Sequence, residues 1–93
     1  MDKEYMLELI RARLKVLDKR LKAALNQQNE QGKAITYGAA AAIRTLTLRD
    51  IGTLKVMEQV LCWSKAKMYI DDEDLIQAFH RLTEPCERYR RRR

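Results

Sequence analysis

The chain has few of the residues that build metal centres or disulfide frameworks, and it has no long apolar run. Its 93 residues include one histidine and two cysteines, Cys62 and Cys86, which stand far apart and outside any CxxC or Cys/His cluster. A structural zinc site needs about four such ligands. A membrane span needs roughly 18 consecutive apolar residues, and the N-terminus is charged, unlike a signal peptide. We therefore expect no metal, no membrane contact, and synthesis in a reducing cytoplasm.

Residues that could run a reaction are scarce as well. His80 has no catalytic companion, so we interpret it as a surface or half-buried helix residue. The acidic run Asp71–Asp74 lacks the spaced oxygen ligands and glycine of a calcium loop and is interpreted as a helix cap. Gly32 and Gly38 lack the Lys-Ser/Thr of a phosphate-binding loop. No catalytic residue, cofactor or enzymatic activity is expected.

Positive charge is what the chain has in excess. There are 19 Lys+Arg against 13 Asp+Glu, giving a formal net charge of +6. The charge is uneven, because residues 71–87 are acidic and residues 88–93 are arginines apart from one tyrosine. Such a balance favours contact with phosphates or with an acidic protein surface. The plainer interpretation, that the charge only provides solubility, stays open.

Residues 3–26 are expected to form one amphipathic helix. Apolar residues recur every three or four positions along it, which places them on one stripe. The stripe consists of Leu7, Ile10, Leu14, Leu17, Leu21 and Ala24, widened by Met6, Leu9, Val16 and Leu25. The other surface carries the cations Arg11, Arg13, Lys15, Lys19, Arg20 and Lys22, which we interpret as possible DNA-facing residues. Polar residues 26–33 then end the helix, with Gly32 as the turn residue.

A small β-hairpin and a second helix are expected next. Ile35–Tyr37 and Ile43–Leu46 are β-branched and aromatic runs that favour paired strands, although the alanines between them favour helix. Thr47-Leu-Arg-Asp50 has the form of a capping box, so the second helix should begin near Leu48. Its core face is expected to comprise Leu54, Met57, Leu61 and Met68.

The second helix carries more apolar surface than a short chain can cover. Val56, Val60 and Trp63 lie on a face beside the expected core face. Aromatic residues dominate protein interfaces. We therefore interpret these three residues as a subunit interface, although a lone helical tryptophan usually belongs to a core.

A short third helix should begin at Asp71–Asp74, and Pro85 should end or bend it. The basic tail that follows can bind phosphates or pair with carboxylates. Its residues Arg88, Tyr89, Arg90, Arg91, Arg92 and Arg93 are the candidate set for binding DNA or an acidic protein partner. The expected fold is mostly α with a small β-hairpin (α+β), with two antiparallel helices around it. Residues 1–70 form the core domain and residues 71–93 the C-terminal helix and tail.

The order of these elements resembles the W family of tailed-phage head-to-tail joining proteins, also called head-completion proteins. The similar residues are Ile35–Gly38, then Arg44–Ile51, then the helix that reaches Trp63. The resemblance covers roughly residues 5–68. The stretch Gly38–Ala42 is longer than the tight turn of that family, and residues 71–87 are an addition.

The resemblance implies a virion structural protein located at the neck of the particle. Such proteins form a ring, commonly of twelve copies, beneath the portal protein; the ring extends the DNA channel and binds the next connector protein. Basic residues could then contact packaged DNA non-specifically, or the arginine tail Arg88–Arg93 could bind acidic clefts of the portal protein. The competing interpretation is a small basic DNA-binding protein, like a terminase small subunit or a regulator, though no helix-turn-helix pattern is evident. A binder of an acidic host protein is a third.

Overall fold

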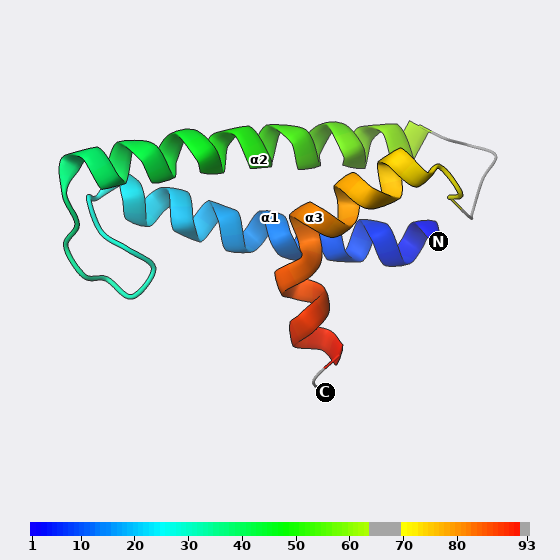
Figure 1. The fold of residues 1–93 in the computed structure, drawn as a ribbon, viewed down its shortest axis with the longest axis horizontal. Coiled ribbons are helices and arrows are strands. Elements are labelled where there is room, and N and C mark those ends of the chain that lie inside the picture. Colours follow the sequence, from blue (N-terminus) through cyan, green and yellow to red (C-terminus); the bar gives the residue numbers. More distant parts are fainter. Residues whose placement is uncertain (64–69, 92–93) are drawn as a thin grey trace.

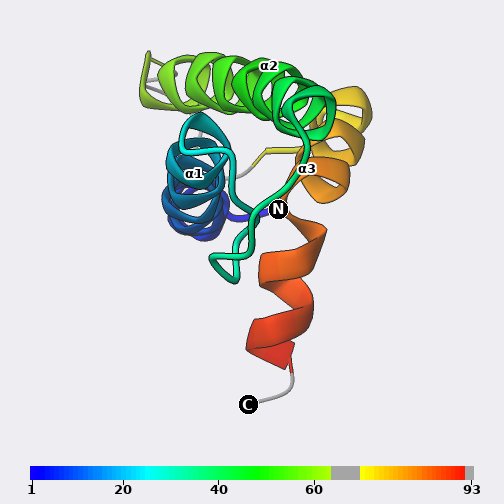
Figure 2. The ribbon, with the colours of Figure 1, turned by 90° about the vertical axis from the view of Figure 1, so that its left-hand side faces the viewer.

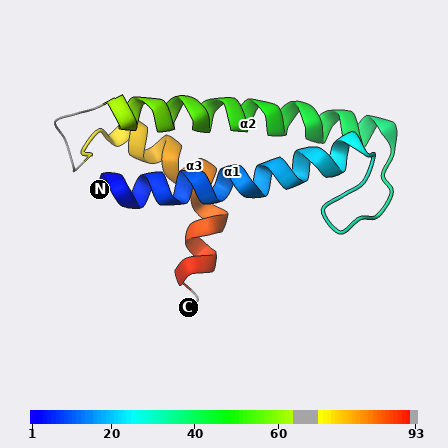
Figure 3. The same cartoon turned by 180° about the vertical axis from the view of Figure 1, so that it is seen from behind.

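Three helices account for most of the chain that the structure describes. The computed structural model describes the backbone of residues 1–63 and 70–91 and the side chains of residues 1–63 and 70–84. The helices are α1 (Lys3–Leu25), α2 (Tyr37–Trp63) and α3 (Glu73–Arg91). α1 and α2 lie side by side and antiparallel, and α3 crosses them on one side (Figures 1 and 3). The mainly helical class is confirmed.

α1 follows the predicted range to within one residue. The buried positions are those of the apolar stripe and its flank: Met6, Leu7, Leu9, Ile10, Leu17 and Ala24. Val16 and Leu25, expected to widen the stripe, are 39% and 60% exposed. The helix ends at Leu25 with Asn26 as its C-cap, and Gly32 has a φ of +81°, so the glycine supplies a left-handed turn in the polar segment as expected.

The predicted hairpin of Ile35–Tyr37 with Ile43–Leu46 is wrong. Residues from Tyr37 onward belong to α2, so Ile43–Leu46 lies within a helix and does not pair as a strand. An isolated bridge joins Gln28 and Ala34 in the link before it. Alanine has the highest helix propensity, so Ala39–Ala42 favours a continuous helix. Residues 40, 47 and 54 are then buried at helical spacing, and this packing against α1 outweighs the local β preference.

The expected start of the second helix is wrong for the same reason. Thr47 lies inside α2 and is 3% exposed, so it does not cap the helix. Thr36 is the cap: its Oγ1 accepts a hydrogen bond from the Ala39 N–H at 3.1 Å. The predicted core face is confirmed for Leu54, Met57 and Leu61, while Met68 lies outside the described residues.

α3 begins where the acidic run predicted and is longer than expected. The Asp72 carboxylate accepts a hydrogen bond from the Leu75 N–H at 3.1 Å, so its capping role is confirmed. Phe79 is fully buried and Leu82 is 9% exposed. The helix does not end at Pro85 but continues to Arg91, and its ribbon changes direction partway along its length (Figure 1). Proline removes one helical hydrogen bond, which accounts for the bend.

All three helices share one apolar core. It joins Leu9, Ile10 and Leu17 of α1 to Leu54 and Leu61 of α2 and to residues 79 and 82 of α3. Viewed end-on, α2 lies above α1 and the first half of α3 (Figure 2). α1 and α3 therefore cover the two lower flanks of α2, and its third side faces outward.

Candidate interaction surfaces

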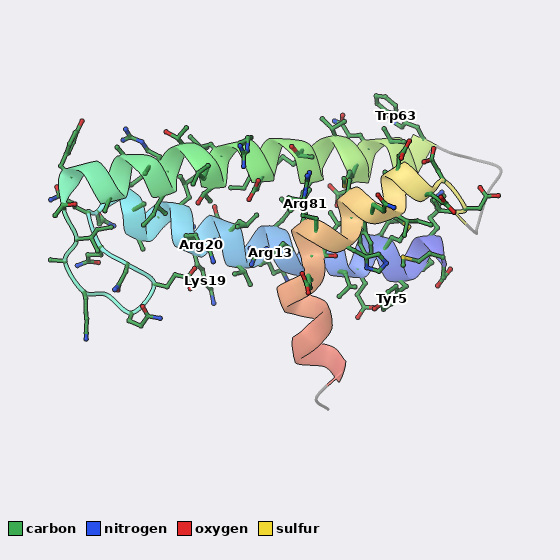
Figure 4. All side chains as sticks on the ribbon, viewed as in Figure 1. Tyr5, Arg13, Lys19, Arg20, Trp63 and Arg81 are labelled. Atoms are coloured by element: carbon green, nitrogen blue, oxygen red, sulfur yellow. The ribbon has the colours of Figure 1, made fainter. Side chains whose placement is uncertain are left out.

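Three large apolar side chains occupy the side of α2 that faces away from the core. Val56, Val60 and Trp63 are 59%, 48% and 73% exposed. Their spacing of four and three residues places them together on one side of a helix. At about 100° per residue, that side is nearly opposite Leu54. Figure 4 shows Trp63 projecting from α2 away from the other two helices. We call Val56, Val60 and Trp63 the outer α2 face.

The outer α2 face lies farther from the core than the sequence indicated. The interpretation placed these residues beside the core stripe; in the structure they point away from it, because α1 and α3 pack on the two flanks and leave the back of α2 open. A tryptophan this exposed leaves its apolar ring in water, which is unfavourable in the isolated chain. The arrangement is suited to burial against another molecule.

A cavity of about 380 Å³ lies between α1, the link of residues 26–36 and the first half of α2. We call it the link groove. Its walls are Arg20 of α1, residues 28–31 of the link, and Ile43, Leu46 and Thr47 of α2. Leu46 is 52% exposed and gives the groove an apolar wall, while Thr47 beside it is buried. The Arg20 guanidinium and the Glu30 carboxylate form an ion pair in the same wall.

Sequence reasoning did not find the link groove. It assigned Ile43–Leu46 to a strand and treated the link as a polar turn. The helical spacing of Ile43, Leu46 and Thr47 was present in the sequence, but only the fold brings these residues next to Arg20 and Glu30.

Most of the expected DNA-facing cations of α1 have partners within the chain. Arg11 Nε donates to Glu58 of α2 at 2.9 Å, and Arg13 Nε donates to the Leu82 carbonyl of α3 at 3.1 Å. Arg20 pairs with the link, and Lys22 pairs with Asp18 one turn away at 3.0 Å. The two other cations, Lys15 and Lys19, are exposed. Four of the six expected DNA-facing residues thus have intramolecular partners.

The arginine end extends away from the three-helix body. The second half of α3 carries the backbone of Arg88–Arg91 outward (Figures 1 and 2). The side chains of residues 85–93, and Arg92 and Arg93 altogether, lie outside the described residues, so the structure does not place this predicted binding set against a site.

The described residues contain few groups that could bind a metal or take part in a reaction. Residues 1–63 and 70–84 hold no group of three or more His, Cys, Asp and Glu side chains arranged to bind a metal. His80 is half-buried, and its ring lies 5.4 Å from that of Phe79. The pKa of Arg11 is raised above its ordinary value, chiefly by the hydrogen bond to Glu58. Within the described part of the chain, none of the helices is both long and apolar enough to cross a membrane.

Comparisons of the chain with models of protein families, with curated proteins and with solved structures find no match.

Proposed function

We propose that the chain is a virion structural protein, a head-to-tail adaptor that assembles with copies of itself into a ring beneath a portal protein. The ring extends the DNA channel and presents a docking site for the next connector protein. The observation that carries this proposal is the outer α2 face, with Val56, Val60 and Trp63 exposed together and Trp63 at 73%.

The energetics favour a protein partner for this face. A buried aromatic side chain removes about 150–250 Å² from water, at about 25 cal/mol per Å². Covering the exposed part of Trp63 alone therefore contributes about 3 kcal/mol. Val56 and Val60 lie on the same side of the helix and enlarge the contact. Exposed aromatic and aliphatic residues grouped in this way mark interaction sites.

The resemblance to the W family supports the proposal only through the helix that reaches Trp63. It gives no support through a hairpin, because those residues are helical. The outward course of α3 supports a second contact, in which the arginine end meets the portal protein or the phosphates of packaged DNA.

A duplex DNA-binding role has less support. Lys15 and Lys19 are exposed cations in its favour, but their neighbours on α1 are paired within the chain. The link between α1 and α2 also spans residues 26–36, longer than the three to four residues or so of a helix-turn-helix. Steeply salt-dependent binding to a duplex in the absence of any self-association would favour this role over the adaptor.

Sedimentation velocity over a range of protein concentrations, with and without portal rings from the same genome, tests the adaptor proposal. We expect concentration-dependent oligomers or portal-bound rings, and we expect Trp63→Ala to weaken both. Tyr37→Ala is the matched control, because Tyr37 is 72% exposed near the other end of α2. A protein that is monomeric at every concentration and does not bind the portal rings would contradict the proposal.

A further inference from the structure

The link groove has the composition of a site for an aromatic side chain. Ile43 and Leu46 give it an apolar wall, and the Arg20 guanidinium lies at the same cavity. Guanidinium groups stack on indole rings. The polar side chains of residues 28–31 supply acceptors for an indole N–H, which needs a partner when it is buried. At about 380 Å³ the groove is within the size range of ligand-binding pockets, about 300–1,000 Å³.

The link wall of the groove is preformed by hydrogen bonds. The Asn29 side chain accepts from the N–H groups of Gln31 and Lys33, each at 2.9 Å. The Ile35 N–H donates to the Gln27 carbonyl at 3.0 Å, and the Gln27 side chain donates back to the Ile35 carbonyl at 3.1 Å. A wall that is ordered before binding loses less conformational entropy when a partner arrives.

The groove and Trp63 of the same chain cannot meet. Trp63 ends α2, whereas Leu46 lies 17 residues earlier on the same rigid helix. At 1.5 Å per residue this separates them by about 25 Å along the axis. The two side chains also point in different directions, since Leu46 lies on the flank toward the link and Trp63 on the outer face.

We propose that Trp63 of one copy docks in the link groove of the next copy, head to tail. This inference rests on the proposed self-assembly and specifies its contact. The indole packs on Ile43 and Leu46 and stacks on the Arg20 guanidinium, while Val60 covers the rim. Because the two surfaces differ and lie at different ends of α2, the contact is heterologous. Such contacts form a ring when the rotation between successive copies closes.

Complementing variants test the contact. Trp63→Ala removes the inserted side chain, and Leu46→Asp places a charge in the groove; each variant alone should self-associate at least about 30-fold more weakly than the wild type. Mixed in equal amounts, they should form dimers and no larger species, because one copy keeps an intact groove and the other an intact Trp63. Leu48→Asp is the matched control: Leu48 is 51% exposed on the opposite flank and should leave assembly unchanged.

The outcomes separate this contact from the proposed function. The groove contact is overturned if Trp63→Ala abolishes the oligomers and Leu46→Asp does not. It is also overturned if the equal mixture of the two variants stays monomeric. In either case the proposed self-assembly of the wild type still stands. If the wild type is monomeric at every concentration, with and without portal rings, both proposals fail. The single tryptophan provides a second readout, because its emission should shift to shorter wavelength on assembly of the wild type and of Leu48→Asp but not of Leu46→Asp. Circular dichroism of each variant confirms that it is folded.

Discussion

Met1 and Ile70 exchange two hydrogen bonds. The Met1 amino group donates to the Ile70 carbonyl at 2.5 Å, and the Ile70 N–H donates to the Met1 carbonyl at 2.7 Å. Ile70 is buried and lies just ahead of α3. The pair therefore ties the start of α1 to the start of α3 and helps to set where α3 crosses the helix pair.

This tie predicts that an N-terminal extension is destabilising. A Gly-Ser pair placed ahead of Met1 replaces the charged amine by an amide and puts chain where the amine lies. We expect a loss of about 1 kcal/mol of unfolding free energy, since charged hydrogen bonds contribute about that much or more. The melting temperature should fall by several degrees. The same pair added after Arg93 is the control, and equal melting temperatures for the two extended proteins would contradict the prediction.

Phe79 should be the most sensitive position in α3. It is fully buried where α3 meets the other helices. Phe79→Ala should cost about 3–5 kcal/mol, because a large cavity remains, and Phe79→Leu should cost less, about 1–1.5 kcal/mol. Urea unfolding followed by circular dichroism measures both. A cost below about 1 kcal/mol for Phe79→Ala would show that α3 does not pack as described.

Two glycines should respond to alanine with opposite signs. Gly52 lies inside α2 with nothing within 4 Å of an added Cβ, so Gly52→Ala should stabilise the fold by about 0.5–1 kcal/mol. Gly32 also has open space, but its φ of +81° strains an L side chain, so Gly32→Ala should destabilise by about 1 kcal/mol. Denaturant midpoints of the two variants and of the wild type, measured on the monomer, give the two stability changes. Changes of the same sign would contradict the helical backbone at Gly52 or the left-handed backbone at Gly32.

The contribution of Arg11 to the stability of the fold should not change with pH near neutrality. Its pKa is raised, chiefly by the hydrogen bond to Glu58, so its contribution to stability is fully present below the unfolded-state pKa and is lost only as the pH rises past the folded-state value. Both values are strongly alkaline. The difference in melting temperature between wild type and Arg11→Gln should thus be constant between about pH 6 and pH 9, and small. Lys15→Gln is the control for general charge effects; a difference that varies across this range would refute the assignment.

The first helix was predictable because its signal is local and repeated. Apolar residues at helical spacing from Leu7 to Ala24 determine both the helix and its buried side. The Asp72 cap was predictable for a similar reason, since acidic residues favour a helix start whatever packs around them.

The hairpin was mispredicted because two local signals conflicted. Ile35–Tyr37 and Ile43–Leu46 favour strands, and the alanines between them favour helix. The conflict is resolved by Thr47 and Ala40, which pack against α1 only if the whole segment is helical. A tertiary contact of this kind cannot be seen in a short window of sequence.

The candidate surfaces were likewise predictable only in part. That Val56, Val60 and Trp63 share one side of a helix follows from their spacing alone. That this side faces solvent follows only from α1 and α3 occupying the two flanks of α2. The link groove likewise needs Arg20, the link and Leu46 to be adjacent in space.

The sequence by itself determined the helical character of the chain, its basic terminus and the grouping of its apolar residues, because periodicity and charge act over a few residues. The tertiary structure alone decided where α2 begins, which apolar residues remain exposed and where the groove lies. Those features depend on how three helices share one core, and helix packing is fixed by contacts between residues far apart in the chain.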